Sequence, residues 1–168
     1  MQKELRLRLD ELWNDPASQY ALAGASPSTI GAYILGEMST SILECDWDAQ
    51  RTLVGIASSI GEVEERARIL NLLLLMPGHQ LHQEVAFEIQ RTRSPSSVPF
   101  IRQRLEAGFA DLDYTCSEPQ TIAKWFSHAL AKIGTPDAIA VIEEFSQSAD
   151  VGIASEMSYR LDRLAGRE

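Results

Sequence analysis

Two histidines of this chain have a spacing that metal sites use. His79 and His82 are three residues apart, which would place both side chains on one side of a helix. No paired cysteines or carboxylate motif accompany them, and Cys45 and Cys116 are far apart in the sequence. An isolated pair of this kind is weak evidence for a metal. We therefore expect no metal site.

Motifs for catalysis are missing as well. The sequence has no glycine-rich phosphate loop, no nucleophile elbow and no zinc-protease helix motif. Its carboxylates are numerous, but nothing singles out a pair for acid–base work. We expect a protein that is not an enzyme, has no catalytic residues and needs no cofactor. Such a protein would act by binding another macromolecule.

A more informative segment is GFADLDYTCSE, residues 108–118. Carboxylates beside aromatic rings suit a basic protein partner, because charge steers the partner and rings anchor it. The alternative is a solvated loop in which Phe109, Leu112 and Tyr114 pack back on the helices. The partner-binding residues predicted in this segment are Asp111, Asp113, Tyr114 and Glu118.

A second group of candidate residues follows this segment. Trp125 and His128 are three residues apart, and therefore on one side of a helix. Glu156 and Tyr159 have the same spacing in a later helix. We predict that these four residues line a groove beside the segment and contact the same partner. The alternative is that they are polar groups satisfied between stacked helices.

The overall charge favours a basic partner. The 168 residues carry a net charge of −9 and have a pI near 4.8. Between Glu106 and Glu156, nine acidic residues accompany two basic ones, Lys124 and Lys132. An acidic surface repels phosphate backbones, so nucleic-acid binding is not expected. One basic cluster could grip a phosphate or an acidic partner, but pairing with acidic neighbours such as Glu88 is the preferred interpretation. Its members are Arg91, Arg93, Arg102 and Arg104.

Apolar residues that recur three and four positions apart indicate helices along the whole chain. No stretch alternates as a strand does, so we predict an all-α fold of about nine helices. A linker of small residues is expected after Pro16, and a loop over residues 109–118. The predicted helices contain residues 5–12, 30–38, 46–61, 62–76, 81–89, 94–108, 122–133, 139–145 and 153–164.

The apolar pattern also repeats. A forward shift of 31 residues places Phe126 and Leu130 on Met157 and Leu161, and further positions of the two helices coincide. A backward shift of 41 residues reaches a third helix in the same way. One helix pair cannot bury its own apolar stripe, whereas stacked pairs form a continuous core. The longer interval locates an insertion at residues 108–118, and insertions in such stacks often lie at the binding face.

The stretch HALAKIGTPDAIAVIEEFSQSADVGIASEMSYRL resembles HEAT-like repeats of the short bacterial type. The match is good over residues 120–165, fair over 47–107 and absent before Asp46. The chain departs from the usual Val-Arg opening of the last helix, where it has Gly152-Ile153. The resemblance implies an α-α superhelix of stacked antiparallel helix pairs, a HEAT-like solenoid. We expect one domain over residues 1–168, with N-terminal capping helices in 1–45 and repeats in 46–168.

The resemblance leaves the function open, because helical repeats serve many partners. The leading hypothesis is sequestration of a basic protein, in the manner of an immunity protein that blocks a bacterial toxin. A HEAT-like domain that recognises damaged DNA, or acts as a glycosylase, is the main alternative. It would need a basic concave face. A lyase-like or maturation scaffold is the third hypothesis.

The sequence further predicts a cytoplasmic protein without a membrane partner. Lys3, Arg6 and Arg8 are followed by no apolar run, so no signal peptide is expected. The longest apolar stretch, residues 72–76, is far too short to span a bilayer. Two cysteines are too few for the disulfide framework of a small secreted protein.

Overall fold

The computed structural model describes residues 1–12 and 14–166, which form helices and no strand. No helix in these residues is long and apolar enough to cross a membrane. The α-helices are α1 (Lys3–Glu11), α2 (Pro16–Leu22), α3 (Ile30–Leu43), α4 (Trp47–Ser59), α5 (Val63–Leu75), α6 (His82–Thr92), α7 (Val98–Ala107), α8 (Pro119–Ile133), α9 (Pro136–Phe145) and α10 (Val151–Leu164). Two short 3₁₀ helices, η1 (Pro95–Ser97) and η2 (Ala110–Thr115), precede α7 and α8.

Short polar side chains and left-handed residues set the ends of these helices. The Asp46 carboxylate accepts a hydrogen bond from the Ala49 amide at the start of α4. Asp150 accepts from two amides at the start of α10. Such caps satisfy amides that have no partner within the helix. The ends of α6 and α8 fall at Arg93 and Gly134, both in the left-handed conformation.

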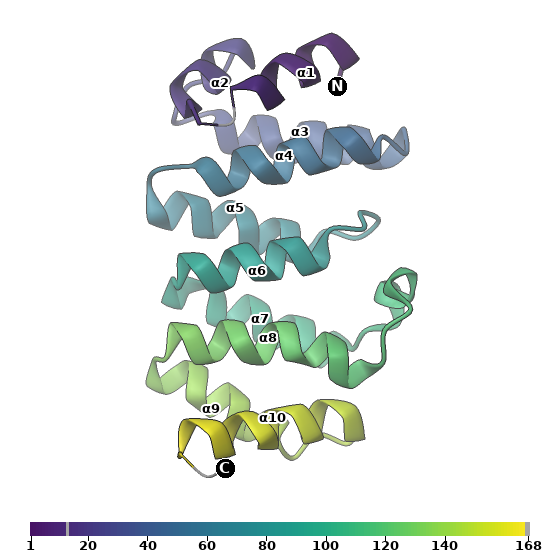
Figure 1. Cartoon of the computed structure of the whole chain (residues 1–168), viewed down its shortest axis with the longest axis vertical. Helices are drawn as coiled ribbons and strands as arrows, with labels where there is room; N and C mark the ends of the chain where they lie inside the picture. Colours follow the sequence, from purple (N-terminus) through teal and green to yellow (C-terminus); the bar gives the residue numbers. More distant parts are fainter. Residues whose placement is uncertain (13, 167–168) are drawn as a thin grey trace.

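The α-helices from α3 onward lie in two layers (Figure 1). In the front layer α4, α6, α8 and α10 follow one another, each packed on the next. In the layer behind, α3, α5, α7 and α9 do the same. Consecutive helices also contact each other between the layers. The helices α1 and α2 lie over α4 at the N-terminal end of the stack.

The core lies between the two layers, and the predicted apolar stripes fill it. Its fully buried members include Leu53, Ile69, Leu73, Val85, Ile89, Ile101, Phe126, Leu130, Ile142 and Met157. The all-α prediction is therefore confirmed. Leu164 lies in the predicted stripe of the last helix but is 48% exposed. No helix follows α10 in the described part of the chain to cover this residue.

The repeated apolar pattern corresponds to one layer. The helix ends matched in the sequence at Arg93, Gly134 and Ala165 are the C-caps of α6, α8 and α10. The fourth, Gly61, directly follows the C-cap of α4 at Ile60. Equivalent positions of the repeat therefore occupy equivalent places along the front layer.

The prediction of nine helices is wrong, because α2 lies in the stretch expected to be a linker. Asp15 and Pro16 end the first helix, but they also begin the next one. The Asp15 carboxylate accepts from the Ser18 amide, and Pro16 stands in the first turn. Gln19 and Tyr20 are buried, and the Gln19 side-chain amide donates to the Leu9 carbonyl. The predicted loop at 109–118 also contains η2.

Two glycines test how tightly the helices pack. A β-carbon on Gly152 would lie 2.8 Å from the Gln120 backbone nitrogen and 3.1 Å from Pro119. The Gly152-Ile153 opening thus lets α10 approach the start of α8. Gly36 of α3 has no neighbour within 4 Å of the same position.

We predict that Gly152→Ala lowers the free energy of unfolding by about 1–3 kcal/mol, because a backbone must move to admit the methyl group. Gly36→Ala should raise it by about 0.5–1 kcal/mol, because alanine restricts the unfolded chain and favours the helix. Urea unfolding of both variants measures the two changes. Equal effects of the two substitutions would show that α8 and α10 are not in close contact here.

Candidate functional site

The inserted segment is docked on the helices. Phe109 and Leu112 are buried, and the Phe109 ring stacks on the ring of Phe126 in α8, with 5.8 Å between their centroids. A hydrogen bond from the Leu112 amide to the Phe109 carbonyl begins the turn of η2. The expectation that these apolar residues pack back on the helices is confirmed. The same turn leaves Asp113 exposed.

A buried pair of histidines meets the tyrosine of this segment. The rings of His79 and His82 are stacked, with centroids 4.0 Å apart, and both residues are 1% exposed. The Tyr114 hydroxyl accepts from the His82 amide at 3.3 Å and lies 3.1 Å from Nδ1 of the His82 ring. Tyr114 therefore fastens η2 to the first residue of α6.

The hydrogen bonds define the protonation of both rings. Nδ1 of His79 accepts from the Leu81 amide at 3.1 Å, so the proton lies on Nε2 and is donated to the Leu73 carbonyl, 2.8 Å away. The Tyr114 hydroxyl already accepts from an amide and is free to donate to Nδ1 of His82. Nε2 of His82 is then the protonated nitrogen, and it has no hydrogen-bond partner among the described residues.

Burial lowers the pKa of both histidines. For His82 the pKa falls from 6.5 to about 3, first because of burial, then because of the neighbouring His79 and the charge of Arg104. The charge of Asp111 acts in the opposite direction. Burial is also the main cause of the lowered pKa of His79, which the Leu73 carbonyl partly offsets. Both rings are neutral near pH 7.

A second tie holds the segment at Asp111. Its carboxylate accepts a hydrogen bond from the guanidinium of Arg104 in α7, whose side chain is 7% exposed. Burial would raise the pKa of Asp111, but the hydrogen bond and charge of Arg104 outweigh it and hold that pKa below its ordinary value. Asp111 therefore serves to fasten the segment.

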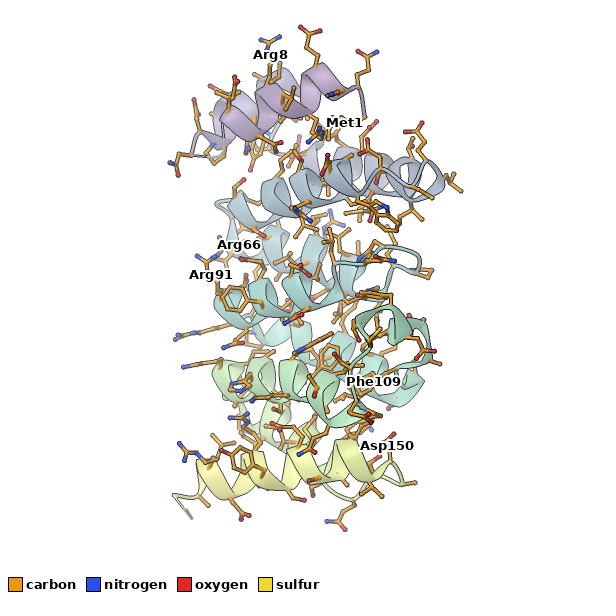
Figure 2. The ribbon with its side chains drawn as sticks, turned by 45° about the vertical axis from the view of Figure 1, so that its right-hand side comes forward. Met1, Arg8, Arg66, Arg91, Phe109 and Asp150 are labelled. Carbon is orange, nitrogen blue, oxygen red and sulfur yellow. The ribbon has the colours of Figure 1, made fainter. Side chains whose placement is uncertain are left out.

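The remaining carboxylates of this region point to the surface. Glu84, Asp113 and Glu118 are exposed, and we call these three residues the acidic edge. Glu84 begins α6 beside the buried histidines, and Glu118 is the residue before α8. Figure 2 shows that edge of the stack at Phe109 and Asp150, with Arg66 and Arg91 at the opposite edge.

Glu156 of the second predicted group is buried. It is 4% exposed, and its Oε1 accepts from the Ser127 hydroxyl at 2.6 Å and from Arg160 at 3.0 Å. The Arg160 Nε–H group also donates to the Ser127 oxygen at 3.2 Å. These three residues form a closed network between α8 and α10. The interpretation of Glu156 as a satisfied polar group between stacked helices fits this arrangement.

The other members of the second group lie around this network. Trp125 is half-buried with its ring edge-on to Phe126, and Tyr159 is 51% exposed beside the Arg160 guanidinium. His128 is half-buried, and burial is the main cause of its lowered pKa, followed by the charge of Arg160. The structure brings these side chains together at α8 and α10, apart from the ties that hold η2.

A recess lies between the ends of α8 and α10. Its volume is about 330 Å³, and its lining consists of His128, Ala131, Lys132, Arg160, Arg163 and Leu164. Sequence reasoning missed the cations of this recess, because it counted charge along the chain. The repeat register could have found them, since it aligns Lys132 with Arg163.

The basic cluster predicted near the turn at residue 93 is largely paired within the protein. Arg91 pairs with Glu88, and Arg102 pairs with Glu106 and Glu144. The preferred interpretation of intramolecular pairing is confirmed for these residues. Elsewhere, Cys45 and Cys116 are both exposed and unpaired. Among the described residues no cluster of three or more His, Cys, Asp or Glu side chains is placed to hold a metal ion.

The largest hollow lies at the N-terminal end, away from these groups. It has a volume of about 1160 Å³ and lies where α2 and the following turn meet the start of α5. Tyr20, Ala21, Pro27 and Ile60 are among its apolar lining residues, and Glu62 and Arg68 among its charged ones. None of the predicted site residues lines it.

Comparisons with known protein families, characterised proteins and solved structures gave no match. The functional argument therefore depends on the geometry of this chain alone.

We predict that acid destabilises the protein through the buried histidines. Below pH 6.5 the unfolded chain binds a proton at residue 82 that the folded protein refuses until about pH 3. Stability present above pH 6.5 is thus lost as the pH falls, by up to about 1.4 kcal/mol per pH unit. From pH 7.5 to pH 5 the loss from His82 alone is about 2 kcal/mol.

Urea unfolding at several pH values measures this loss. His82→Gln should remove most of the slope contributed by that residue, whereas His128→Gln, at a half-buried position, should leave the wild-type slope nearly unchanged. An identical pH dependence in wild type and His82→Gln would contradict the assignment.

Proposed function

We propose that this protein is a binding module without catalytic activity, built as a HEAT-like superhelix, that holds a basic protein surface at its acidic edge. The layered packing and the coincidence of the sequence repeat with one layer support the superhelical assignment. In such a superhelix, α4, α6, α8 and α10 line the binding side. The inserted segment then lies at one margin of that side.

The observation that carries the proposal is the docking of η2. Tyr114 and Asp111 tie the segment to α6 and α7, while Asp113 and Glu118 remain exposed. A segment that is already ordered loses little conformational entropy when a partner binds. Its two free carboxylates are therefore presented in a fixed arrangement beside Glu84.

A purely structural explanation accounts for only part of this edge. Acidic residues near helix starts are stabilised by the helix dipole by about 0.3–1 kcal/mol each. This effect explains Glu84 in the first turn of α6 and Glu118 before α8. Asp113 belongs to the inserted segment and starts no α-helix. Its placement beside the other two concentrates negative charge where a cationic partner would approach.

The partner that fits best is a basic protein of the toxin type, which the module would sequester as an immunity protein does. A net charge of −9 would speed the approach of such a partner through long-range attraction. The internal pairing of Arg91, Arg102 and Arg104 removes the basic cluster that the DNA-binding alternative needed.

We predict that Asp113→Asn/Glu118→Gln weakens capture of a basic partner from lysate of the source organism, by roughly tenfold in affinity at low salt. Asp137→Asn/Glu143→Gln, on exposed positions of α9, makes the same charge change elsewhere and should retain the partner. High salt should release the partner from wild type, since screening weakens exposed charge contacts.

Mass spectrometry of the eluates, compared between the two variants, decides the outcome. A single basic protein lost with the first variant and kept with the second would support the acidic edge. Equal retention by both variants would exclude it.

A further inference from the structure

We infer that the face formed by α6, α8 and α10 is a second binding surface, which takes an acidic peptide segment in extended conformation. This inference is independent of the proposed function, because it concerns other residues and a partner of opposite charge. We call the surface the cationic face. Its members are Phe87, Arg91, Lys124, His128, Lys132, Tyr159, Arg160 and Arg163.

The repeat places a ring and a cation at the same register on all three helices. The shifts of 41 and 31 residues that align the apolar stripes also align Phe87 with His128 and Tyr159. In each helix a cation follows four residues later, so that ring and cation share one face. The three pairs are Phe87 with Arg91, His128 with Lys132, and Tyr159 with Arg163.

The pairs reach the surface. Phe87 is 54% and Tyr159 51% exposed, and Arg91 and Lys132 are exposed as well. Because α6 packs on α8 and α8 on α10, the three pairs follow one another across the front layer. Exposed rings that recur at one register are the large, rigid contacts that dominate protein interfaces.

The charge at this face is opposite to that of the whole chain. The recess between α8 and α10 is lined by Lys132, Arg160, Arg163 and His128, and by no carboxylate. Glu156 neutralises one of these charges through its bond to Arg160. The ends of α8 and α10 together contribute about one negative charge, roughly half a charge each. Positive charge remains in excess, so the recess suits a carboxylate.

Stabilisation of helix ends does not explain the whole pattern. Cations near a helix C-terminus are favoured by the dipole, which accounts for Lys132 and Arg163 in the last turns. The dipole gives no reason for exposed rings one turn earlier. The pairing of ring and cation instead matches a ligand that has both apolar and anionic groups.

The spacing of the pairs indicates an extended segment. Packed helices lie about 8–10 Å apart, so three successive pairs span roughly 16–20 Å. An extended peptide covers that distance in about five or six residues. A carboxylate at every third position, with apolar side chains between, would match the three cations. A long polyanion such as a nucleic acid would continue beyond the face and be repelled by a protein of charge −9.

The experiment is a fluorescence anisotropy titration with a labelled eight-residue peptide, Glu-Ser-Phe-Glu-Ser-Phe-Glu-Ser, at low salt. The matched probe has glutamine in place of each glutamate, and a labelled oligothymidine of twelve nucleotides tests the polyanion. We expect the glutamate peptide to bind roughly tenfold more tightly than either of the other probes.

The variant Lys132→Gln/Arg163→Gln should weaken binding of the glutamate peptide by roughly tenfold. Lys3→Gln/Arg8→Gln, at exposed positions of α1, removes the same charges and should bind as wild type does. Circular dichroism of both variants confirms that they are folded. The inference is overturned if the glutamate peptide does not bind, if both variants weaken it equally, or if oligothymidine binds more tightly.

Discussion

The packing of α8 against its neighbours is the interaction on which the rest of the structure depends. This helix contacts α6 and α10 within its own layer and α7 and α9 behind it. Phe126 and Leu130 are fully buried, and Ala123 and Ala129 are small enough to let the adjoining helices approach. The same helix receives the Phe109 ring of the inserted segment and supplies Ser127 to the network with α10. Both candidate binding surfaces are therefore positioned by one helix.

The inserted segment is held by polar groups, which gives it a defined place. An apolar contact alone would permit several positions, whereas the Tyr114 hydroxyl must meet the His82 amide and ring together. This specificity has a cost, because Nε2 of His82 and Nε of Arg104 are buried without a partner among the described residues. Buried polar groups of this kind are tolerated where their position matters. The arrangement explains how an insertion between repeats is ordered at the edge of the stack.

Sequence reasoning predicted the features that depend on local periodicity. The apolar stripes, the all-α fold and the helix ends at Arg93 and Gly134 follow from spacing within each helix. Features that depend on contacts between helices could not be read in this way. Glu156 occupies the register of Trp125, but a serine opposite and an arginine one turn later draw it inside. The α2 helix was missed because Asp15-Pro16 is a signal both to end a helix and to begin one.

Net charge misled the sequence reasoning for a related reason. Helices α4, α6, α8 and α10 all begin at one edge of the front layer and end at the other. Their dipoles are parallel, so acidic residues are favoured at the first edge and basic residues at the second. The repeat thus separates charges that are mixed along the chain. A total of −9 describes the approach of a distant partner, but the contact itself depends on which edge the partner meets. One such module can present an acidic edge and a cationic face at the same time.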